Sequence, residues 1–176
     1  YGPQGTGLLL CGEGQPEPLL EGGTGSLSAL QTMPDFLPDR LEAGTHNMPG
    51  IAGLLEGLRY VRSRGTEAIL RRERRLIRQA ARGLAALPDL QVYEAENPVD
   101  QAGVLSFRVK GMDCEEVGEQ LGRHGIAVRA GLHCAPTAHQ SAGTLETGTV
   151  RLSVSDFNTP AEIECLIYVL SRLGRE

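Results

Sequence analysis

The sequence predicts an α/β fold whose main body is a compact α+β domain, with helices on one face of a mainly antiparallel sheet. Helical and strand patterns alternate from residue 66 in the order α-β-β-α-β-β-α. Strand segments alternate apolar and polar residues, and two helix starts carry capping residues. The length of 176 residues fits one domain and a piece of another.

Residues 1–50 are rich in glycine and proline and read mostly as loop, apart from a short apolar run at Leu8–Cys11 that predicts a strand. Glycines add no side chain to a core and cost backbone entropy on ordering. We therefore expect this part to be a segment of a larger domain. The start on Tyr1, in a crowded turn, suggests a fragment whose natural N-terminus lies upstream.

The next segments predict two helices. Residues 51–65 carry apolar residues at spacings of three and four, which indicates a connecting helix that breaks near Gly65. Thr66 is the expected N-cap of a long second helix that ends before Pro88. These boundaries predict three parts: 1–50, the connecting helix 51–65 and a small α/β domain that covers residues 66–176.

The small domain is built from four predicted strands and two further helices. The strands are expected at 90–93, 104–109, 126–129 and 150–155. Asp113, with Glu three residues later, predicts a short helix that ends near residue 125. Thr159-Pro160 predicts the start of the last helix. Residues 130–149 read as loop.

Composition excludes several classes. Net charge is −5, with 16 Arg and a single lysine, Lys110, which argues against a nucleic-acid partner. The Arg cluster at 71–78 is interpreted as a solvated helix face, with Glu67 placed to support Arg71. No apolar run is long enough to cross a bilayer. The four cysteines lack both zinc-motif spacing and disulfide-scaffold density, and a cytoplasmic location is expected.

Cys134 lies where a predicted strand ends in a glycine turn. Arg129 and His133 lie near it in the sequence and are the kind of cationic neighbours that favour a thiolate, so Cys134 is a candidate nucleophile. The alternative is an incidental exposed cysteine. A zinc site with His139 is disfavoured by the spacing, and no metal is predicted. The other cysteines read as packing residues.

Arg151 is expected on the strand after this loop, aimed away from the apolar face. A guanidinium there could hold a carboxylate through two hydrogen bonds, or it could be an ordinary surface residue. Its proximity to Cys134 requires that the two strands pair.

Five spaced motifs give the chain a strong resemblance to the C-terminal part of the cysteine desulfurase family of class V aminotransferase-type enzymes. They are Tyr1-Gly2-Pro3-Gln4-Gly5-Thr6-Gly7, Gly22-Gly23-Thr24-Gly25-Ser26, Leu41-Glu42-Ala43-Gly44-Thr45-His46-Asn47, Arg129-Ala130-Gly131-Leu132-His133-Cys134-Ala135-Pro136 and Arg151-Leu152-Ser153-Val154-Ser155-Asp156-Phe157-Asn158-Thr159. The resemblance implies the small domain of an aspartate aminotransferase-like enzyme that uses pyridoxal phosphate, together with a segment of its large domain.

The resemblance also implies an activity for the parent protein, the conversion of L-cysteine to L-alanine. Cys134 matches the nucleophile that keeps the sulfur as a persulfide, and Arg151 matches the arginine that holds the substrate carboxylate. Arg129 and His133 match supporting residues. Gly23 and Thr24 match a segment that reaches the cofactor phosphate in the partner subunit, which implies a homodimer. A protein sulfur acceptor is a further possible partner.

Two departures from the family pattern, and several alternative readings of the chain, accompany the resemblance. Leu132 and Leu41 replace residues common in relatives, and the family's Schiff-base lysine is expected just before Tyr1, so the chain alone is expected to be inactive. Lys110 matches no family lysine. The parent could instead be a selenocysteine lyase or another class V lyase. From a different class, the chain alone could be a non-catalytic fold module, or a sulfur-accepting partner that uses Cys134.

Overall fold

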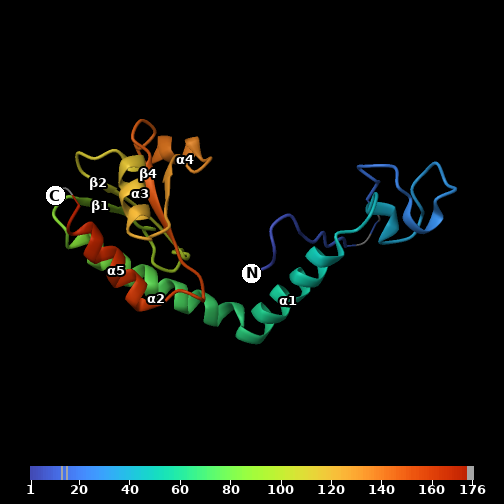
Figure 1. Ribbon diagram of the computed structural model, residues 1–176, viewed down its shortest axis with the longest axis horizontal. Helices are drawn as coiled ribbons and strands as arrows, with labels where there is room; N and C mark the ends of the chain where they lie inside the picture. The colour runs from blue at the N-terminus through green and yellow to red at the C-terminus, as the bar shows by residue number, and fades with distance from the viewer. Residues whose placement is uncertain (13, 15, 174–176) are drawn as a thin grey trace. The chain divides into compact units, whose positions relative to one another are not determined.

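The computed structural model describes residues 1–12, 14 and 16–173, and the chain forms two compact units, Tyr1–Arg64 and Gly65–Glu176 (Figure 1). The division falls at Gly65, the residue expected to interrupt the helical run. Its backbone has a φ of 80°, in the left-handed region that glycine adopts without a steric penalty. The last residues of the expected 66–176 domain, 174–176, lie outside the described residues.

The sheet of the second unit has four strands, β1 (Leu90–Tyr93), β2 (Val104–Val109), β3 (Arg129–Gly131) and β4 (Thr149–Ser153). Their order is β1-β2-β4-β3, and every neighbouring pair is antiparallel. The predicted antiparallel sheet is therefore confirmed. β4 pairs with both β2 and β3, so residues far apart in the sequence meet along it.

Helices α2 (Thr66–Ala85), α3 (Cys114–Arg123) and α5 (Pro160–Leu170) share one core with this sheet. α2 and α5 lie side by side (Figure 1) and contact each other, while α3 packs on β3 and β4. A short fourth helix, α4 (Pro136–Ser141), follows β3. This arrangement confirms the predicted helix-and-sheet domain.

The core follows the strand alternation that the sequence predicts. On β2 the buried residues are Leu105, Phe107 and Val109, with Phe107 fully buried. On β4, Val150 and Leu152 are buried, which leaves Arg151 on the opposite face. Burial of these apolar side chains is the main favourable term for the second unit.

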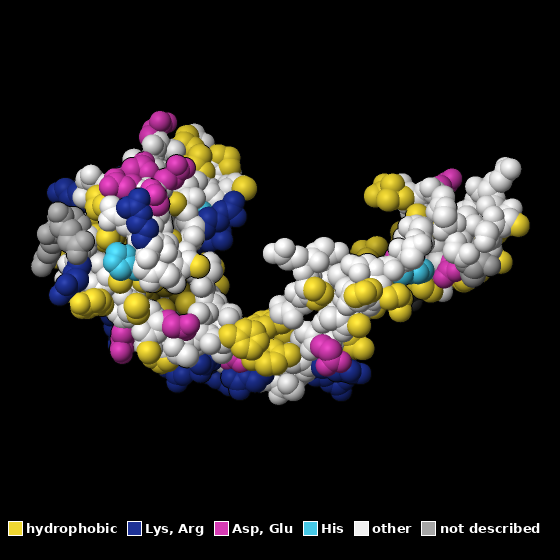
Figure 2. Space-filling view, viewed as in Figure 1, with side chains coloured by type: hydrophobic (Ala, Val, Ile, Leu, Met, Phe, Trp, Pro, Cys, Tyr) yellow, Lys and Arg dark blue, Asp and Glu magenta, His cyan; other side chains and the backbone are white. Residues whose placement is uncertain are grey.

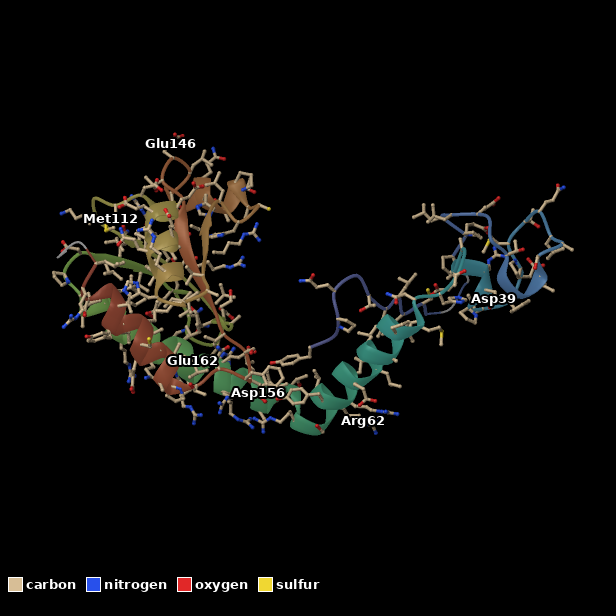
Figure 3. The ribbon with its side chains drawn as sticks, in the orientation of Figure 1. Asp39, Arg62, Met112, Glu146, Asp156 and Glu162 are labelled. Carbon is tan, nitrogen blue, oxygen red and sulfur yellow. The ribbon has the colours of Figure 1, made fainter. Side chains whose placement is uncertain are left out.

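Capping groups set the starts of α3 and α5. The Asp113 carboxylate accepts hydrogen bonds from the backbone amides of Glu115 and Glu116. Thr159 and Glu162 form a full capping box at the start of α5, where Figure 3 labels Glu162. Hydrogen bonds from the backbone amide and then the hydroxyl of Thr159 hold the pKa of the Glu162 carboxyl below its usual value.

Cys114 is buried as expected, but Cys11 and Cys165, also interpreted as packing residues, are exposed. The strand expected at 150–155 is β4, which covers Thr149–Ser153.

Four further local expectations are wrong. Gly65, rather than Thr66, is the N-cap of α2. β3 covers Arg129–Gly131 instead of 126–129, because the apolar residues before it pack on the core without pairing to β4. The expected loop 130–149 contains the end of β3 and also α4, which begins at Pro136. Leu8–Cys11 forms no strand, and its leucines are exposed.

The Arg cluster of α2 divides between two faces. Arg72 donates to the Asn158 carbonyl oxygen and lies 3.6 Å from the Asp156 carboxylate, while Arg74 donates to the Gln101 and Val99 carbonyl oxygens. The other arginines of the helix are exposed, and Figure 2 shows basic side chains gathered along its outer face. The exposed members are Arg71, Arg75, Arg78 and Arg82.

The first unit is built on one long helix, α1 (Met48–Arg64), as the 51–65 pattern predicts, with short 3-10 helices at Gly25–Leu27 and Asp39–Leu41. The start of the chain packs on α1. The Tyr1 and Tyr60 rings stack at 5.4 Å, and a Cβ on Gly57 would lie 2.5 Å from the Tyr1 carbonyl oxygen. In the part of the chain that the structure describes, no helix is both long and apolar enough to pass through a bilayer.

Candidate active site

The Cys134 thiol lies at the tip of a tight turn between β3 and α4. The Ala135 amide donates to the Leu132 carbonyl oxygen at 2.9 Å, and the two central residues, His133 and Cys134, have φ values of 54° and 58°. Residues other than glycine rarely adopt this left-handed backbone conformation, because it costs roughly 1–2 kcal/mol per residue. The turn is thus held in an unfavourable backbone conformation that presents an exposed thiol.

Arg129 supplies a cation to that thiol. Its guanidinium, on β3, donates toward the Cys134 sulfur at 3.5 Å. This contact places a fixed positive charge next to the sulfur of the candidate nucleophile. The structure therefore brings together the two residues that the sequence predicts as nucleophile and supporting cation.

The His133 ring points to Thr149 and His139 behind the turn. Its Nε2 lies 3.1 Å from the Thr149 hydroxyl oxygen. Partial burial, and then the charges of Arg151, His139 and Arg129, lower the pKa of His133 from its ordinary value. Its Nδ1 is buried and has no hydrogen-bond partner among the described residues. These surroundings disfavour the protonated form of the ring.

Arg151 completes a basic surface on the outer face of the sheet. In the register of the strands it lies opposite Arg129 on β3 and Ser106 on β2. Like charges in directly opposite positions repel each other. The Arg151 Nε is buried without a hydrogen-bond partner among the described residues. An anion would relieve both costs, and a carboxylate matches the guanidinium fork.

Sequence reasoning missed three residues behind the turn: Thr149, His139 and Thr144. The three are buried polar residues, and they are hydrogen-bonded to one another or to His133. Thr149 could have been found from the pairing of the strand after the loop with the strand before Cys134. His139 was considered only as a disfavoured zinc ligand and Thr144 gave no signal, because both fall in a segment interpreted as loop.

The first unit holds Gly23 and Thr24 in a separate pocket of about 590 Å3. At Gly23, a Cβ would lie 2.8 Å from the Gly44 Cα, so only glycine lets the two loops approach this closely. No Asp or Glu lies among the described lining residues, which are Gly22, Gly23, Thr24, Gly25, Ser28, Leu30, Gln31, Gly44, Thr45, His46 and Met48.

Hydroxyls and backbone amides line this pocket, as in many phosphate sites, but the Gly25 and Gly44 amides both donate to the Gly23 carbonyl oxygen. The buried Thr24 hydroxyl donates to the Leu27 carbonyl oxygen at 2.9 Å, so it would have to rotate to donate to a ligand. Lys110, the single lysine, lies exposed in the turn after β2. Among the described residues, no group of three or more His, Cys, Asp or Glu side chains is arranged to hold a metal ion.

The fold, the Cys134 turn and the pocket at Gly23 and Thr24 can now be compared with known families. The sequence profile described as Aminotransferase class-V matches residues 1–166. The chain therefore belongs to the class-V aminotransferase family.

Within this family the chain is similar to proteins named cysteine desulfurase. One from Escherichia coli O127:H6 is 37% identical over 184 residues, which cover 99% of this chain and 43% of the relative. One from Salmonella agona is 36% identical over 181 residues. The chain thus spans about 43% of the length of these relatives.

Solved structures agree with the sequence relatives. The apo cysteine desulfurase from Thermococcus onnurineus NA1 superposes with a TM-score of 0.78 and 36% identity, over 90% of this chain and 39% of that one. An S-sulfonic acid form of the Escherichia coli cysteine desulfurase CsdA gives 0.75 and 28%, over 89% and 38%. The predicted resemblance is confirmed, as is the fold, a part of the aspartate aminotransferase-like architecture.

Proposed function

We propose that the protein to which this chain belongs is a pyridoxal phosphate-dependent cysteine desulfurase, which converts L-cysteine to L-alanine and keeps the sulfur on Cys134. The observation that supports it most directly is the Cys134 thiol, held at the tip of a left-handed turn with the Arg129 guanidinium 3.5 Å from its sulfur. The similarity to cysteine desulfurases over 99% of the chain supports the same reaction.

Cys134 is the nucleophile of this reaction. The thiol reacts as its thiolate and releases its proton to solvent, because Cys134 is exposed and the surroundings of His133 disfavour a protonated ring. The thiolate attacks the sulfur of the substrate, an S–S bond forms, and the substrate carbon–sulfur bond breaks. The electron pair of that bond remains with the carbon skeleton, which takes up a proton to become alanine. The enzyme is left with a Cys134 persulfide.

Arg151 binds the substrate carboxylate in this proposal. Its place opposite Arg129 in the sheet concentrates positive charge that a carboxylate would neutralise. Arg129 and His133 support the thiolate and the turn. Fixing the carboxylate on the rigid strand β4 orients the substrate for attack.

The first unit contributes to cofactor binding. Pyridoxal phosphate, when bound, withdraws electrons from the carbon skeleton of the substrate. Gly23 and Thr24 would hold its phosphate in the partner subunit of a homodimer, as the pocket around them, with no acidic side chain in its described lining, supports. The lysine that holds the cofactor would lie in the protein upstream of Tyr1, and the chain alone would then be inactive. Residues 1–50 would be large-domain segment, 51–65 the connecting helix and 66–176 the small domain.

The proposal includes a cytoplasmic enzyme that passes its sulfur to a protein acceptor. The exposure of Cys134 supports such a transfer, because a second thiol can reach a persulfide placed there. L-cysteine is the proposed substrate, and comparing the rates with L-cysteine and L-selenocysteine separates desulfuration from a selenocysteine lyase activity.

The test uses the full-length protein with Cys134→Ser. Alanine release from L-cysteine should fall by on the order of 1000-fold or more, as expected when a nucleophile is removed. Cys165→Ser, which alters another exposed cysteine, is the matched control and should keep the parental rate. Unimpaired alanine release by Cys134→Ser would overturn the assignment of the nucleophile.

A further inference from the structure

We propose that His139 and Thr144 are positioning residues of this site, which act on the Cys134 thiol through His133. The inference deepens the proposed function, because it concerns how the nucleophile is presented. It stands on three successive contacts, from Thr144 to His139, from His139 to His133 and from His133 to Thr149.

The first contact fixes the His139 ring. Its Nδ1 lies 2.8 Å from the Thr144 hydroxyl oxygen, and the two residues are 6% and 2% exposed. The Thr144 amide also donates to the His139 carbonyl oxygen at 2.8 Å. Thr144 thus holds both the backbone and the ring of a histidine near the end of α4. A buried polar ring with a single anchor is sensitive to the loss of that anchor.

The second contact is between the rings of His139 and His133. The two imidazole rings lie with centroids 5.5 Å apart and planes at 45°. A cavity of about 150 Å3 lies beside His139, and its lining includes Ala138, Ala142 and Thr149. Because this space adjoins the ring, loss of the Thr144 hydroxyl would leave His139 room to change its orientation relative to His133.

The third contact reaches the turn itself. Thr149, which is 3% exposed and pairs with Gly131, holds the His133 Nε2 at 3.1 Å. The charged or titratable groups acting on His133 are Arg129 from β3, Arg151 from β4 and His139 from α4. With its ring held on two sides, His133 keeps its left-handed backbone, and Cys134 stays within reach of Arg129.

A purely structural alternative is that His139 and Thr144 only pack the end of α4. Under that alternative, removing the Thr144 hydroxyl would lower the stability of the chain and leave the reactivity of the folded thiol unchanged. The two accounts therefore differ in a rate measured on folded protein, and in the pH dependence of that rate.

The experiment measures alkylation of Cys134 by iodoacetamide in the 176-residue chain with Cys11→Ser and Cys165→Ser, since Cys114 is buried. The rate is measured between pH 6 and 9. At neutral pH, Thr144→Val should slow alkylation by about three- to tenfold, the range expected for one lost hydrogen bond. Thr144→Ser should restore the parental rate. The exposed Thr137→Val on α4 is the matched control and should change nothing.

A second readout is the pKa of His133, followed by NMR of its ring. In Thr144→Val it should rise toward the ordinary imidazole value, because burial is the main cause of its depression and a less ordered ring is more hydrated. Circular dichroism confirms that each variant is folded. His139→Leu should slow alkylation as Thr144→Val does.

The proposal is overturned if folded Thr144→Val reacts at the parental rate across the pH range, or if Thr144→Ser is as slow as Thr144→Val. Neither result depends on pyridoxal phosphate or on L-cysteine. If this positioning proposal fails, the desulfurase proposal still stands. If the desulfurase proposal fails, the effect of Thr144 and His139 on the reactivity of Cys134 can still be tested.

Discussion

The two units of the chain bury their apolar residues very differently. In Gly65–Glu176, one continuous core joins α2, α3, α5 and the sheet, and its largest side chains are almost fully buried. In Tyr1–Arg64, Leu10 is 90% exposed and Leu19 is 95% exposed. The comparison teaches that the second unit carries the apolar contacts needed for independent folding, whereas the first leaves much of its apolar surface uncovered by its own residues.

The largest expected effect comes from separating the two units. Residues 65–176, expressed alone, should unfold in urea as one cooperative transition, because their core is intact. Residues 1–64 alone should show no cooperative transition, since glycine-rich loops with exposed leucines offset little of the entropy lost on ordering. Circular dichroism measures both. A cooperative transition in residues 1–64 would remove the proposed difference between the units.

A single substitution probes the same contrast. Phe107→Ala should lower the free energy of unfolding by about 3–5 kcal/mol, because it leaves a cavity in a fully buried site. Phe36→Ala is the matched control in the first unit. Phe36 is 48% exposed and lies outside this core, so Phe36→Ala should change the free energy of the cooperative transition by less than about 1 kcal/mol. Urea denaturation of the 176-residue chain measures both variants, and equal shifts would contradict the contrast.

The sequence predicted the second unit well because its signals are local and agree with one another. β1 and β2 begin and end where alternation and turn residues place them, and Thr159-Pro160 marks α5. The first unit was predicted less well. Leu8–Cys11 reads as a buried strand only if something covers it, and in this structure its leucines are exposed.

The candidate site shows the same limit. Cys134 and Arg129 could be predicted because they are close in the sequence and their chemistry is distinctive. The places of Thr149, His139 and Thr144 depend on strand pairing and on α4. The sequence did not reveal α4, because this helix has only six residues and no strong apolar stripe. The left-handed backbone of His133 is likewise a product of the surrounding contacts, since a histidine does not favour it alone.

A smaller effect should follow from the cap of α3. Asp113→Ala removes the acceptor of the Glu115 and Glu116 amides and should lower the free energy of unfolding by about 1 kcal/mol. The exposed Asp89, in the turn before β1, provides Asp89→Ala as a control of the same charge change. Thermal unfolding of residues 65–176 compares the two variants, and an equal shift would show that the charge, rather than the cap, is responsible.

The smallest effect concerns the ionisation of His133. Burial is the main cause of its lowered pKa, and the Arg151 charge follows, so Arg151→Gln should raise that pKa part of the way toward its ordinary value of about 6.5. Because the folded chain disfavours the protonated ring, the stability from His133 is fully present above about pH 6.5 and is lost as the pH falls through the lower folded value. Arg151→Gln should therefore weaken this pH dependence. NMR titration of the His133 ring measures the change, with the exposed His124 as internal control. An unchanged His133 titration would show that the Arg151 charge does not act on the His133 ring, and would leave burial as the main cause of the lowered pKa.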